Sequence, residues 1–215
     1  MATTSSTTPQ LALWRSEFGK SYTDRNDVEK PERVTSWRRL LDAIPSDQAP
    51  ASAVEIGCNV GWNLVYLQRL GVRDLYGVEP QAYAVARARG RAPEFGVLQG
   101  TAFDLPFKDG FADLAFTSGV LIHIAPEDLA AAMSEIYRVA RRWIVAIEYD
   151  APTEQAIKYR GNGDALWKRD HGGLWRARYP ELVQLARIEL HAKDGYDDCT
   201  AHLFEKPAGA REIAK

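Results

Sequence analysis

The segment from Glu55 to Gly61 (EIGCNVG) brings an acid, two glycines and an asparagine together. A ligand that approaches the backbone closely needs positions without side chains, and Gly57 and Gly61 supply them. Asn59 stands where a third glycine would stand, and asparagine is one of the few residues that adopt left-handed backbone conformations at modest cost. We therefore expect a turn that holds a ligand against its backbone.

A second acid, Glu79, ends the short run DLYGVE. An ionised carboxylate only accepts hydrogen bonds, so Glu79 could accept from both hydroxyls of a ribose. The alternative is a solvated glutamate at a strand end. The order of strand, glycine-containing loop, strand and acid favours a nucleoside site. A nicotinamide dinucleotide fingerprint needs glycines where this chain has Asn59 and Trp62, so an adenosine ligand without a pyrophosphate fits better.

Three later positions add candidate groups. The segment GTAFDLPF (residues 100–107) follows the third expected strand, where it could pair with an adenine edge or form an ordinary surface turn. His123 follows the fourth expected strand, and the usual histidine pKa of about 6.5 suits proton acceptance near neutrality. We predict His123 as a general base, with Tyr149 beside it at the end of the fifth strand. The alternative for His123 is an imidazole that is hydrogen-bonded to a backbone carbonyl.

The stretch from Tyr149 to Trp175 is longer than the roughly 10 to 12 residues that a crossover connection needs. It contains Tyr159, Arg160, Lys168 and Arg169. Because arginine presents a planar fork that matches carboxylate and phosphate groups, we predict an anionic or zwitterionic substrate bound by these side chains. The alternative is a helical excursion whose Trp167 and Trp175 pack on the sheet while its arginines stay in solvent.

The expected strands and helices that must position these residues alternate regularly along the sequence. Short apolar or β-branched runs at 53–57, 74–79, up to 98, 112–118 and 142–149 alternate with helical patterns that begin near 63, 80 and 126. This alternation is typical of successive βαβ units with a parallel sheet. The runs 185–190 and 199–204 are joined without a helix, which predicts an antiparallel hairpin. A further helix is expected over 34–44, before the first strand.

With these motifs in this order, the sequence resembles class I S-adenosylmethionine-dependent methyltransferases over nearly its whole length. The segments WRSEFGKSYTDRN (14–26), GVLIHI (119–124) and YRGNGDALWKRD (159–170) resemble, more narrowly, the pseudaminic-acid-biosynthesis-associated methylase family. The resemblance implies an α/β, Rossmann-like, doubly wound seven-stranded sheet with an antiparallel last strand. It also implies S-adenosyl-L-methionine as cofactor, S-adenosyl-L-homocysteine as product, and methyl transfer to an oxygen or nitrogen of a small polar metabolite, such as a sugar acid, an amino sugar or an amino-acid-like compound.

The resemblance also assigns roles along the chain. It favours an N-terminal helical lid over 11–50, ahead of a methyltransferase domain over 51–207 that has a substrate-side insert at about 150–176. The polar start MATTSSTTPQ by itself predicts a disordered tail over 1–10, and a C-terminal tail is expected over 208–215. Tyr22 or Arg25 is expected near the methionine carboxylate. The full set of expected cofactor-binding residues is Tyr22, Arg25, Glu55, Gly57, Asn59, Gly61, Trp62, Asn63, Glu79, Pro80, Thr101, Ala102, Phe103, Ser118 and Gly119.

Composition narrows the remaining function classes. With 27 basic and 29 acidic residues the net charge is -2, which provides no global positive field for nucleic acid or an anionic membrane. Two cysteines are too few for a disulfide scaffold, and no residue cluster has the spacing of a metal site. No apolar run approaches the length of a membrane helix, and the amino-terminal residues do not resemble a signal peptide. We expect a cytoplasmic protein with a small-molecule substrate. A non-catalytic S-adenosylmethionine-binding module that acts through a partner stays open as an alternative, as does the oligomeric state.

Overall fold

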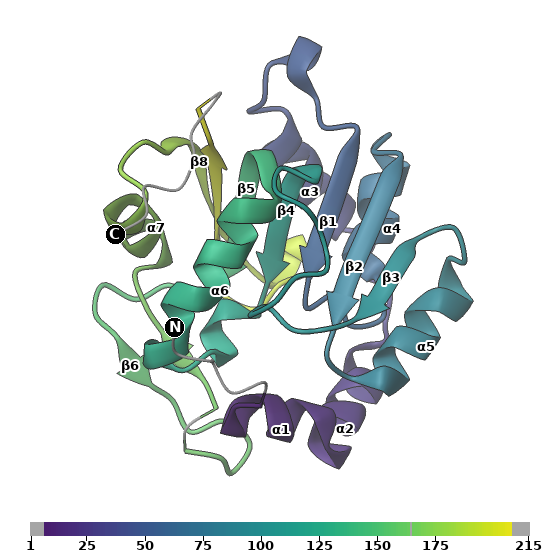
Figure 1. Cartoon of the computed structure of the whole chain (residues 1–215), viewed down its shortest axis with the longest axis vertical. Helices are drawn as coiled ribbons and strands as arrows, with labels where there is room; N and C mark the ends of the chain where they lie inside the picture. The colour runs from purple at the N-terminus through teal and green to yellow at the C-terminus, as the bar shows by residue number, and fades with distance from the viewer. Residues whose placement is uncertain (1–6, 164, 208–215) are drawn as a thin grey trace.

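The computed structural model describes residues 7–163 and 165–207, and its centre is a seven-stranded sheet (Figure 1). The strands are β1 (Ser52–Ile56), β2 (Asp74–Glu79), β3 (Gly96–Gln99), β4 (Ala112–Ser118), β5 (Ala140–Glu148), β8 (Val183–Leu190) and β9 (Cys199–Glu205). Their order across the sheet is β3-β2-β1-β4-β5-β9-β8. The first five strands are parallel, whereas β9 is antiparallel to both of its neighbours. The predicted Rossmann-like seven-stranded sheet with an antiparallel last strand is confirmed, because β9 is the last strand in the sequence, although β8 forms the edge of the sheet.

Helices cover both faces of this sheet, as expected for strands that are buried on both sides. One face packs against α3 (Arg33–Leu41), α4 (Trp62–Arg69) and α5 (Ala82–Arg91), with Trp37, Leu64 and Val85 in the shared core. The other face packs against α6 (Pro126–Val139) and α7 (His171–Arg178), with Met133 and Trp175 buried there. The result is a three-layer α/β domain.

The amino-terminal segment forms two short helices, α1 (Pro9–Arg15) and α2 (Glu17–Asn26), which lie beyond the arrowheads of β1 and β2 (Figure 1). Helix α1 begins inside the stretch that was predicted as a tail, because the Thr8 hydroxyl caps it by accepting a hydrogen bond from the Leu11 amide at 3.1 Å. The prediction of a polar tail as far as residue 10 is therefore wrong for its last two residues. The rest of that tail, up to residue 6, and the predicted tail 208–215 lie outside the described residues.

The connection after β5 contains structure that the sequence pattern did not predict. A two-stranded antiparallel sheet, β6 (Gln155–Ala156) with β7 (Trp167–Lys168), precedes α7. Three 3-10 helices complete the elements of the described chain: η1 (Ser46–Gln48), η2 (Leu121–His123) and η3 (Ala192–Asp194).

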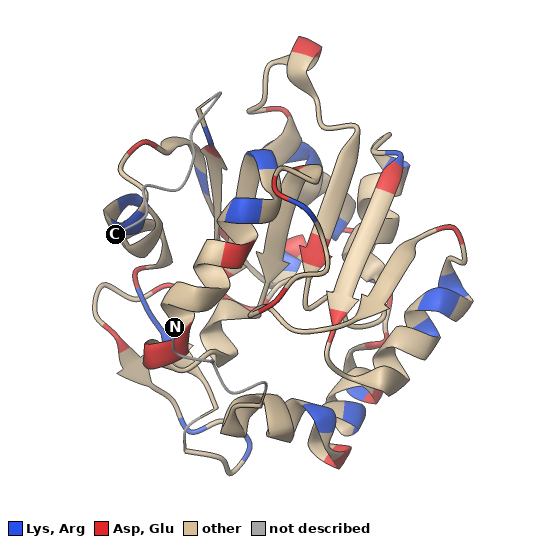
Figure 2. Cartoon of the chain, in the orientation of Figure 1, with Lys and Arg blue, Asp and Glu red and all other residues tan. Residues whose placement is uncertain are grey.

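Charge is distributed so that the middle of the parallel sheet stays apolar. Charged side chains of both signs lie on the outer helices, and β2 carries acidic residues only at its two ends (Figure 2). Within the described residues, none of the helices combines the length and hydropathy that crossing a membrane requires.

Candidate functional site

A cavity of about 240 Å³ lies at the carboxyl ends of the parallel strands. Its walls come from the loop after β1, the ends of β2, β4 and β5, the helices α1 and α2, the start of α3 and the turn between β8 and β9. In doubly wound sheets this edge is where ligands bind, because the loops that diverge there leave a crevice.

The loop after β1 forms the turn that its sequence predicted. Gly57 and Asn59 both have positive φ angles, of 75° and 46°. A Cβ atom on Gly57 would lie only 2.5 Å from a methyl carbon of Val120, so both the backbone conformation and the space require glycine there. The Gly57 and Cys58 amides donate to the carbonyl of Val78 at 2.7 and 3.1 Å, which fixes the loop beside the end of β2.

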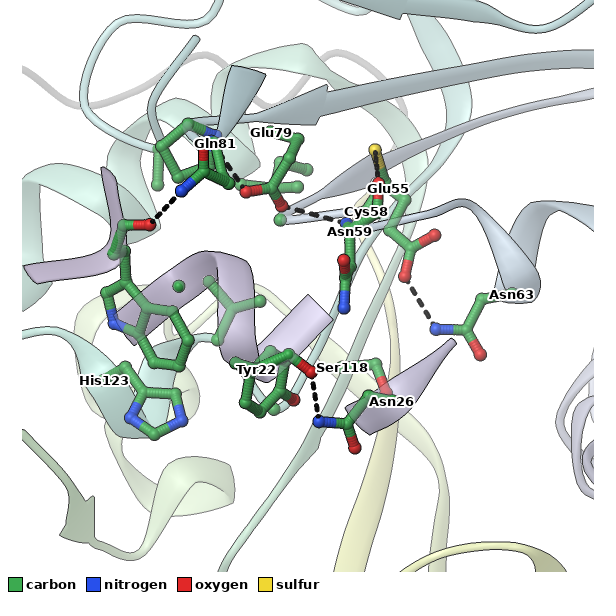
Figure 3. Close-up of a pocket in the computed structure, with 18 of the residues that line it drawn as sticks. Tyr22, Asn26, Glu55, Cys58, Asn59, Asn63, Glu79, Gln81, Ser118 and His123 are labelled. Atoms are coloured by element: carbon green, nitrogen blue, oxygen red, sulfur yellow. Dashed lines mark hydrogen bonds between the residues drawn. The ribbon is translucent and has the colours of Figure 1, made fainter. Parts of the chain in front are cut away.

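Glu79 is built into this loop rather than solvated (Figure 3). Its Oε2 accepts from the Asn59 amide and its Oε1 accepts from the Gln81 amide, both at 2.9 Å. Burial raises the pKa of Glu79 to about 7, and the two amide bonds oppose that rise. Each carboxylate oxygen keeps further acceptor capacity for a ligand in the cavity.

Glu55 has one satisfied and one unsatisfied oxygen. Its Oε1 accepts from the Asn63 side-chain amide at 2.7 Å (Figure 3). Its Oε2 is buried and has no hydrogen-bond partner among the described residues. Burial raises the pKa of Glu55 to about 8, while Asn63 and the positive charge of Arg33 lower it. At that pKa the Glu55 carboxyl is mostly protonated near pH 7, and a cationic ligand group beside it would favour the ionised form, which accepts hydrogen bonds.

His123 lies at the opposite end of the cavity among aromatic rings. Its ring centroid is 4.6 Å from that of Trp14 and 5.2 Å from that of Tyr159. Its Nδ1 is 2.5 Å from the carbonyl oxygen of Ala165, and because a carbonyl only accepts, Nδ1 carries the proton and Nε2 is the free acceptor. Burial lowers the pKa of His123 to about 4, so the ring is neutral near pH 7. The structure shows the alternative for His123, an imidazole hydrogen-bonded to a backbone carbonyl, on a ring that also lines the cavity. The general-base role stays a prediction, and the lowered pKa removes the near-neutral value on which it was based.

Several polar contacts hold α1 and α2 over the cavity. The Gln81 side-chain amide donates to the carbonyls of Trp14 and Ser16 at 3.3 and 3.1 Å. The Thr23 hydroxyl donates to the Asn59 side chain at 3.1 Å. The carboxylate of Asp27, directly after α2, accepts from the indole of Trp62 and pairs with Arg87 and Arg91 of α5.

Most residues predicted to bind the cofactor or act in catalysis line this one cavity. Those that do are Tyr22, Glu55, Gly57, Asn59, Trp62, Asn63, Glu79, Pro80, Thr101, Ala102, Phe103, Ser118, Gly119, His123 and Tyr149. Gly61 is absent from the lining, and it caps α4 in a left-handed conformation. Arg25 is exposed and also absent from the lining, whereas its neighbour Asn26 contributes to it.

The predicted substrate-binding residues are placed differently. Arg169 is buried, and its Nη1, Nη2 and Nε donate to the Leu121 carbonyl, the Ile124 carbonyl and Glu154 at 3.0, 2.8 and 2.7 Å. These bonds use the guanidinium to fix the insert to the β4–α6 connection, so the prediction that Arg169 holds an anionic substrate is wrong.

The other three predicted substrate residues also lie outside the cavity lining. Arg160 is exposed, and the ammonium of Lys168 lies 5.7 Å from the Tyr149 ring centroid. Tyr159 lies outside the lining, and its ring contacts the ring of the lining residue His123.

The sequence pattern missed a charged and aromatic group at the other end of the cavity. Lys30, Arg33, Tyr66, Tyr196 and Asp197 all line it. Asp197 accepts a hydrogen bond from the Tyr149 hydroxyl at 3.0 Å. Lys30 lies in the connection between α2 and α3, and the others come from the start of α3, from α4 and from the β8–β9 turn. No motif marks them. Only Arg33 had a detectable signal, as a cation at the start of a predicted amphipathic helix.

Comparison with known proteins agrees with this geometry. Residues 54–143 match the family model described as "Methyltransferase domain". The chain is 33% identical over 88 residues to the uncharacterized methyltransferase sll0829 of Synechocystis, and this match spans 41% of each protein. The aligned region is thus less than half the length of that curated relative.

Two solved structures show the same fold over most of the chain. The 1,6-didemethyltoxoflavin-N1-methyltransferase of Burkholderia thailandensis, with bound 1,6-didemethyltoxoflavin and S-adenosylhomocysteine, superposes with a TM-score of 0.71 at 16% identity, covering 94% of this chain and 92% of that one. The magnesium protoporphyrin IX methyltransferase of Synechocystis, with bound S-adenosylhomocysteine, superposes with a TM-score of 0.70 at 14% identity, covering 91% and 97%. This chain has the same Rossmann-like fold as these two methyltransferases. At these identities the likeness concerns the fold.

Proposed function

We propose that this protein is a class I S-adenosylmethionine-dependent methyltransferase that modifies an oxygen or nitrogen atom of a small polar metabolite. The observation that carries the proposal is the position of Glu79. It is a buried carboxylate at the end of β2, it faces the cavity, and it is bonded to the amide of Asn59 in the glycine-containing loop. The methyltransferase-domain match over 54–143 supports the same conclusion.

The cavity residues fit the parts of this cofactor. Glu79 would accept from the ribose hydroxyls, and Thr101, Ala102 and Phe103 would lie against the adenine. The amino-acid end would lie toward Glu55, whose unpartnered oxygen suits an ammonium group. When bound, the cofactor supplies a methyl group on a positively charged sulfur.

The chain's own residues have two tasks in such a reaction, which are to align the reactants and to exclude water. Trp14 and Tyr22, with ring centroids 5.0 Å apart, cover the cavity next to His123. We propose that α1 and α2 act as a lid. The free Nε2 of His123 is the acceptor for the proton that a hydroxyl or amine substrate must lose, and the Ala165 carbonyl keeps the ring in the required tautomer.

Charges of both signs lie at the end of the cavity away from His123, so a substrate that uses His123 would have to extend along the cavity to reach them. Lys30 and Asp197 line this end, and the Tyr149 hydroxyl is hydrogen-bonded to Asp197. With Arg160 and Arg169 outside the lining, Lys30 is the candidate for an anionic substrate group and Asp197 for a cationic one. We propose a zwitterionic small-molecule substrate on this basis.

Calorimetry with S-adenosylhomocysteine tests the donor site directly. We expect wild-type protein to bind it, and Glu79→Ala to bind it about 10- to 100-fold more weakly, which is the usual loss for a charge-assisted hydrogen-bonding partner. Glu94→Ala is the matched control, since Glu94 is exposed and lies outside the cavity lining. Thermal melts identify any loss of folded protein, because Glu79 also holds two backbone amides.

A turnover assay distinguishes a methyltransferase from a non-catalytic S-adenosylmethionine-binding module. Wild-type protein with S-adenosylmethionine and a fractionated pool of polar metabolites should form S-adenosylhomocysteine together with one methylated product of matching amount. Absence of S-adenosylhomocysteine binding by the wild type would refute the proposed function.

A further inference from the structure

Four aromatic side chains at the His123 end of the cavity contact one another in a closed circuit. The ring centroid of Trp14 is 4.6 Å from that of His123, which is 5.2 Å from that of Tyr159. The Tyr159 centroid is 6.1 Å from that of Phe18, which is 5.4 Å from that of Trp14. All four distances lie in the range of roughly 4.5 to 7 Å that favours contacts between aromatic rings. We refer to Trp14, Phe18, His123 and Tyr159 as the aromatic cluster.

The aromatic cluster joins three segments that are far apart in the sequence. Trp14 and Phe18 belong to the lid helices α1 and α2, His123 ends η2, and Tyr159 lies in the insert between β6 and β7. The insert passes beside the lid helices (Figure 1). Trp14 and His123 line the cavity, whereas Phe18 and Tyr159 lie outside its lining. The outer pair therefore holds the inner pair together without forming part of the cavity wall.

The backbone of the insert is shaped to present Tyr159. The Tyr159 and Asn162 amides each donate to the carbonyl of the other residue, at 2.8 and 3.0 Å. The two residues between them, Arg160 and Gly161, have φ angles of 47° and 91°, as a type I′ hairpin turn requires. The Ala165 carbonyl, from the same insert, accepts from Nδ1 of His123 at 2.5 Å. The insert therefore holds His123 through a ring contact and through a hydrogen bond.

The lid carries Trp14 and Phe18 as one unit. A Cβ atom on Gly19 would lie only 1.8 Å from the Trp14 carbonyl oxygen, so glycine at this position allows α2 to pack directly against the end of α1. On the side of β2 and α5, the Gln81 side-chain amide donates to the Trp14 carbonyl at 3.3 Å. On the side of β4 and β5, the lid contacts His123 and Tyr159 through its rings. The two sides of the lid are thus attached by different kinds of contact.

These two kinds of contact open differently. Trp14, Phe18 and Tyr159 are half-buried, and contacts between such rings can separate without breaking backbone hydrogen bonds. Segments held by few buried contacts open locally, and enzymes use such segments to admit substrate and then to exclude water. Because Trp14 covers the cavity beside His123, a substrate must pass the aromatic cluster to reach the His123 ring at this end.

Resting on the proposed function, we propose that Tyr159 and Phe18 are positioning residues that latch the lid to the insert. The latch keeps Trp14 over the cavity and keeps the His123 ring against it, and it opens when a substrate enters or a product leaves. Tyr159, which the sequence suggested as a substrate ligand, acts here through Trp14 and His123. The insert thereby controls access to the cavity although its Tyr159 and Arg160 lie outside the lining.

Amide hydrogen exchange on the full chain measures how often the lid opens. Tyr159→Ala removes two of the four ring contacts, so amides of α1 and α2 should exchange about 10-fold faster than in the wild type, while amides of β4 and β5 stay unchanged. Tyr159→Phe keeps the ring and should exchange like the wild type. Lys158→Ala is the matched control, since Lys158 is the exposed neighbour of Tyr159 in the insert.

The imidazole of His123 provides a spectroscopic readout. The chain has four histidines, so the NMR signal of His123 can be assigned from its loss in His123→Gln. In Tyr159→Ala this signal should move, and the pKa of His123 should rise from about 4 toward its usual value of about 6.5, because the ring gains contact with water. The signal of the exposed His191 should stay unchanged, and Tyr159→Phe should leave both signals as in the wild type.

A second variant tests the latch from the lid side. Phe18→Ala removes the partner ring, so it should speed exchange in the insert, just as Tyr159→Ala speeds exchange in the lid. This reciprocal effect is expected when two segments stabilise each other.

The outcomes are distinguishable. Unchanged lid exchange or an unchanged His123 signal in Tyr159→Ala would overturn the latch, and so would equal effects of Tyr159→Ala and Tyr159→Phe. An equal increase of exchange in the lid and in β4 and β5 would also overturn it, because the whole fold would then be weaker. Failure of the wild type to bind S-adenosylhomocysteine would refute the proposed function, whereas exchange and NMR on the free protein decide the latch by themselves.

Discussion

The substitution Glu55→Gln should change how the stability of the free protein depends on pH. Burial raises the pKa of Glu55 from 4.5 to about 8, so the folded protein binds a proton over a pH range in which the unfolded chain has lost it. Stability linked to this proton is fully present below about pH 4.5 and is lost as pH rises through about 8. Glutamine is neutral at every pH and can still accept from Asn63, so the variant lacks this dependence.

The magnitude follows from the size of the pKa change. One pKa unit corresponds to about 1.4 kcal/mol, so a pKa raised from 4.5 to about 8 lowers the free energy of unfolding by at most about 5 kcal/mol between pH 4 and pH 9. The variant and the wild type should be similar at pH 5. By pH 9 the variant should be more stable by several kcal/mol, far beyond the roughly 0.5 kcal/mol typical of surface substitutions.

Urea unfolding at pH 5, 6, 7, 8 and 9 measures this difference. The control is Glu94→Gln, because the pKa of the exposed Glu94 is lowered and its carboxylate stays charged over this whole range. Parallel stability curves for Glu55→Gln and wild type would refute the reasoning, since they would mean that Glu55 titrates as it does in the unfolded chain.

Three more substitutions test other parts of the site. Gly57→Val should abolish S-adenosylhomocysteine binding. The Gly57 φ angle of 75° and the Val120 methyl carbon, 2.5 Å from where a Cβ would lie, both exclude a branched side chain. Normal binding by folded variant protein in calorimetry would contradict the loop assignment. His123→Ala should lower turnover about 10²- to 10⁴-fold with donor affinity unchanged, and a loss below tenfold would limit His123 to a structural role. Arg169→Gln should destabilise the fold by about 1 to 3 kcal/mol in urea unfolding, because it removes the donors of the buried Leu121 and Ile124 carbonyls. Unchanged stability would show that other contacts fix the insert.

Local sequence determined the architecture and the donor half of the site. The alternation of short apolar runs with helical patterns predicted the parallel strands, and the uninterrupted pair 185–190 and 199–204 predicted the hairpin that includes the antiparallel β9. Gly57, Asn59 and Glu79 follow strands that must end at the same edge of a parallel sheet. Their meeting was therefore predictable once the strands were recognised.

The environments of single side chains were decided by tertiary packing. Arg169 and Arg33 are the same residue type, and local sequence favoured Arg169 as the ligand-binding one. In the fold, two carbonyls and Glu154 surround Arg169, whereas Arg33 is held by one carbonyl and a ring and keeps its fork free. Which hydrogen bonds a long side chain makes depends on segments far away in the sequence, here the β4–α6 connection for Arg169 and the β8–β9 turn for Arg33.

The pKa values of the cavity residues also depend partly on the sequence and partly on the tertiary structure. The sequence placed Glu55, Glu79 and His123 at strand ends, but their ordinary pKa values describe solvated groups. Burial raises the pKa of Glu55 to about 8 and lowers that of His123 to about 4. Desolvation depends on every element packed around a group, so the sequence determined which ionisable groups reach the cavity, and only the tertiary structure decided which of them carry charge there.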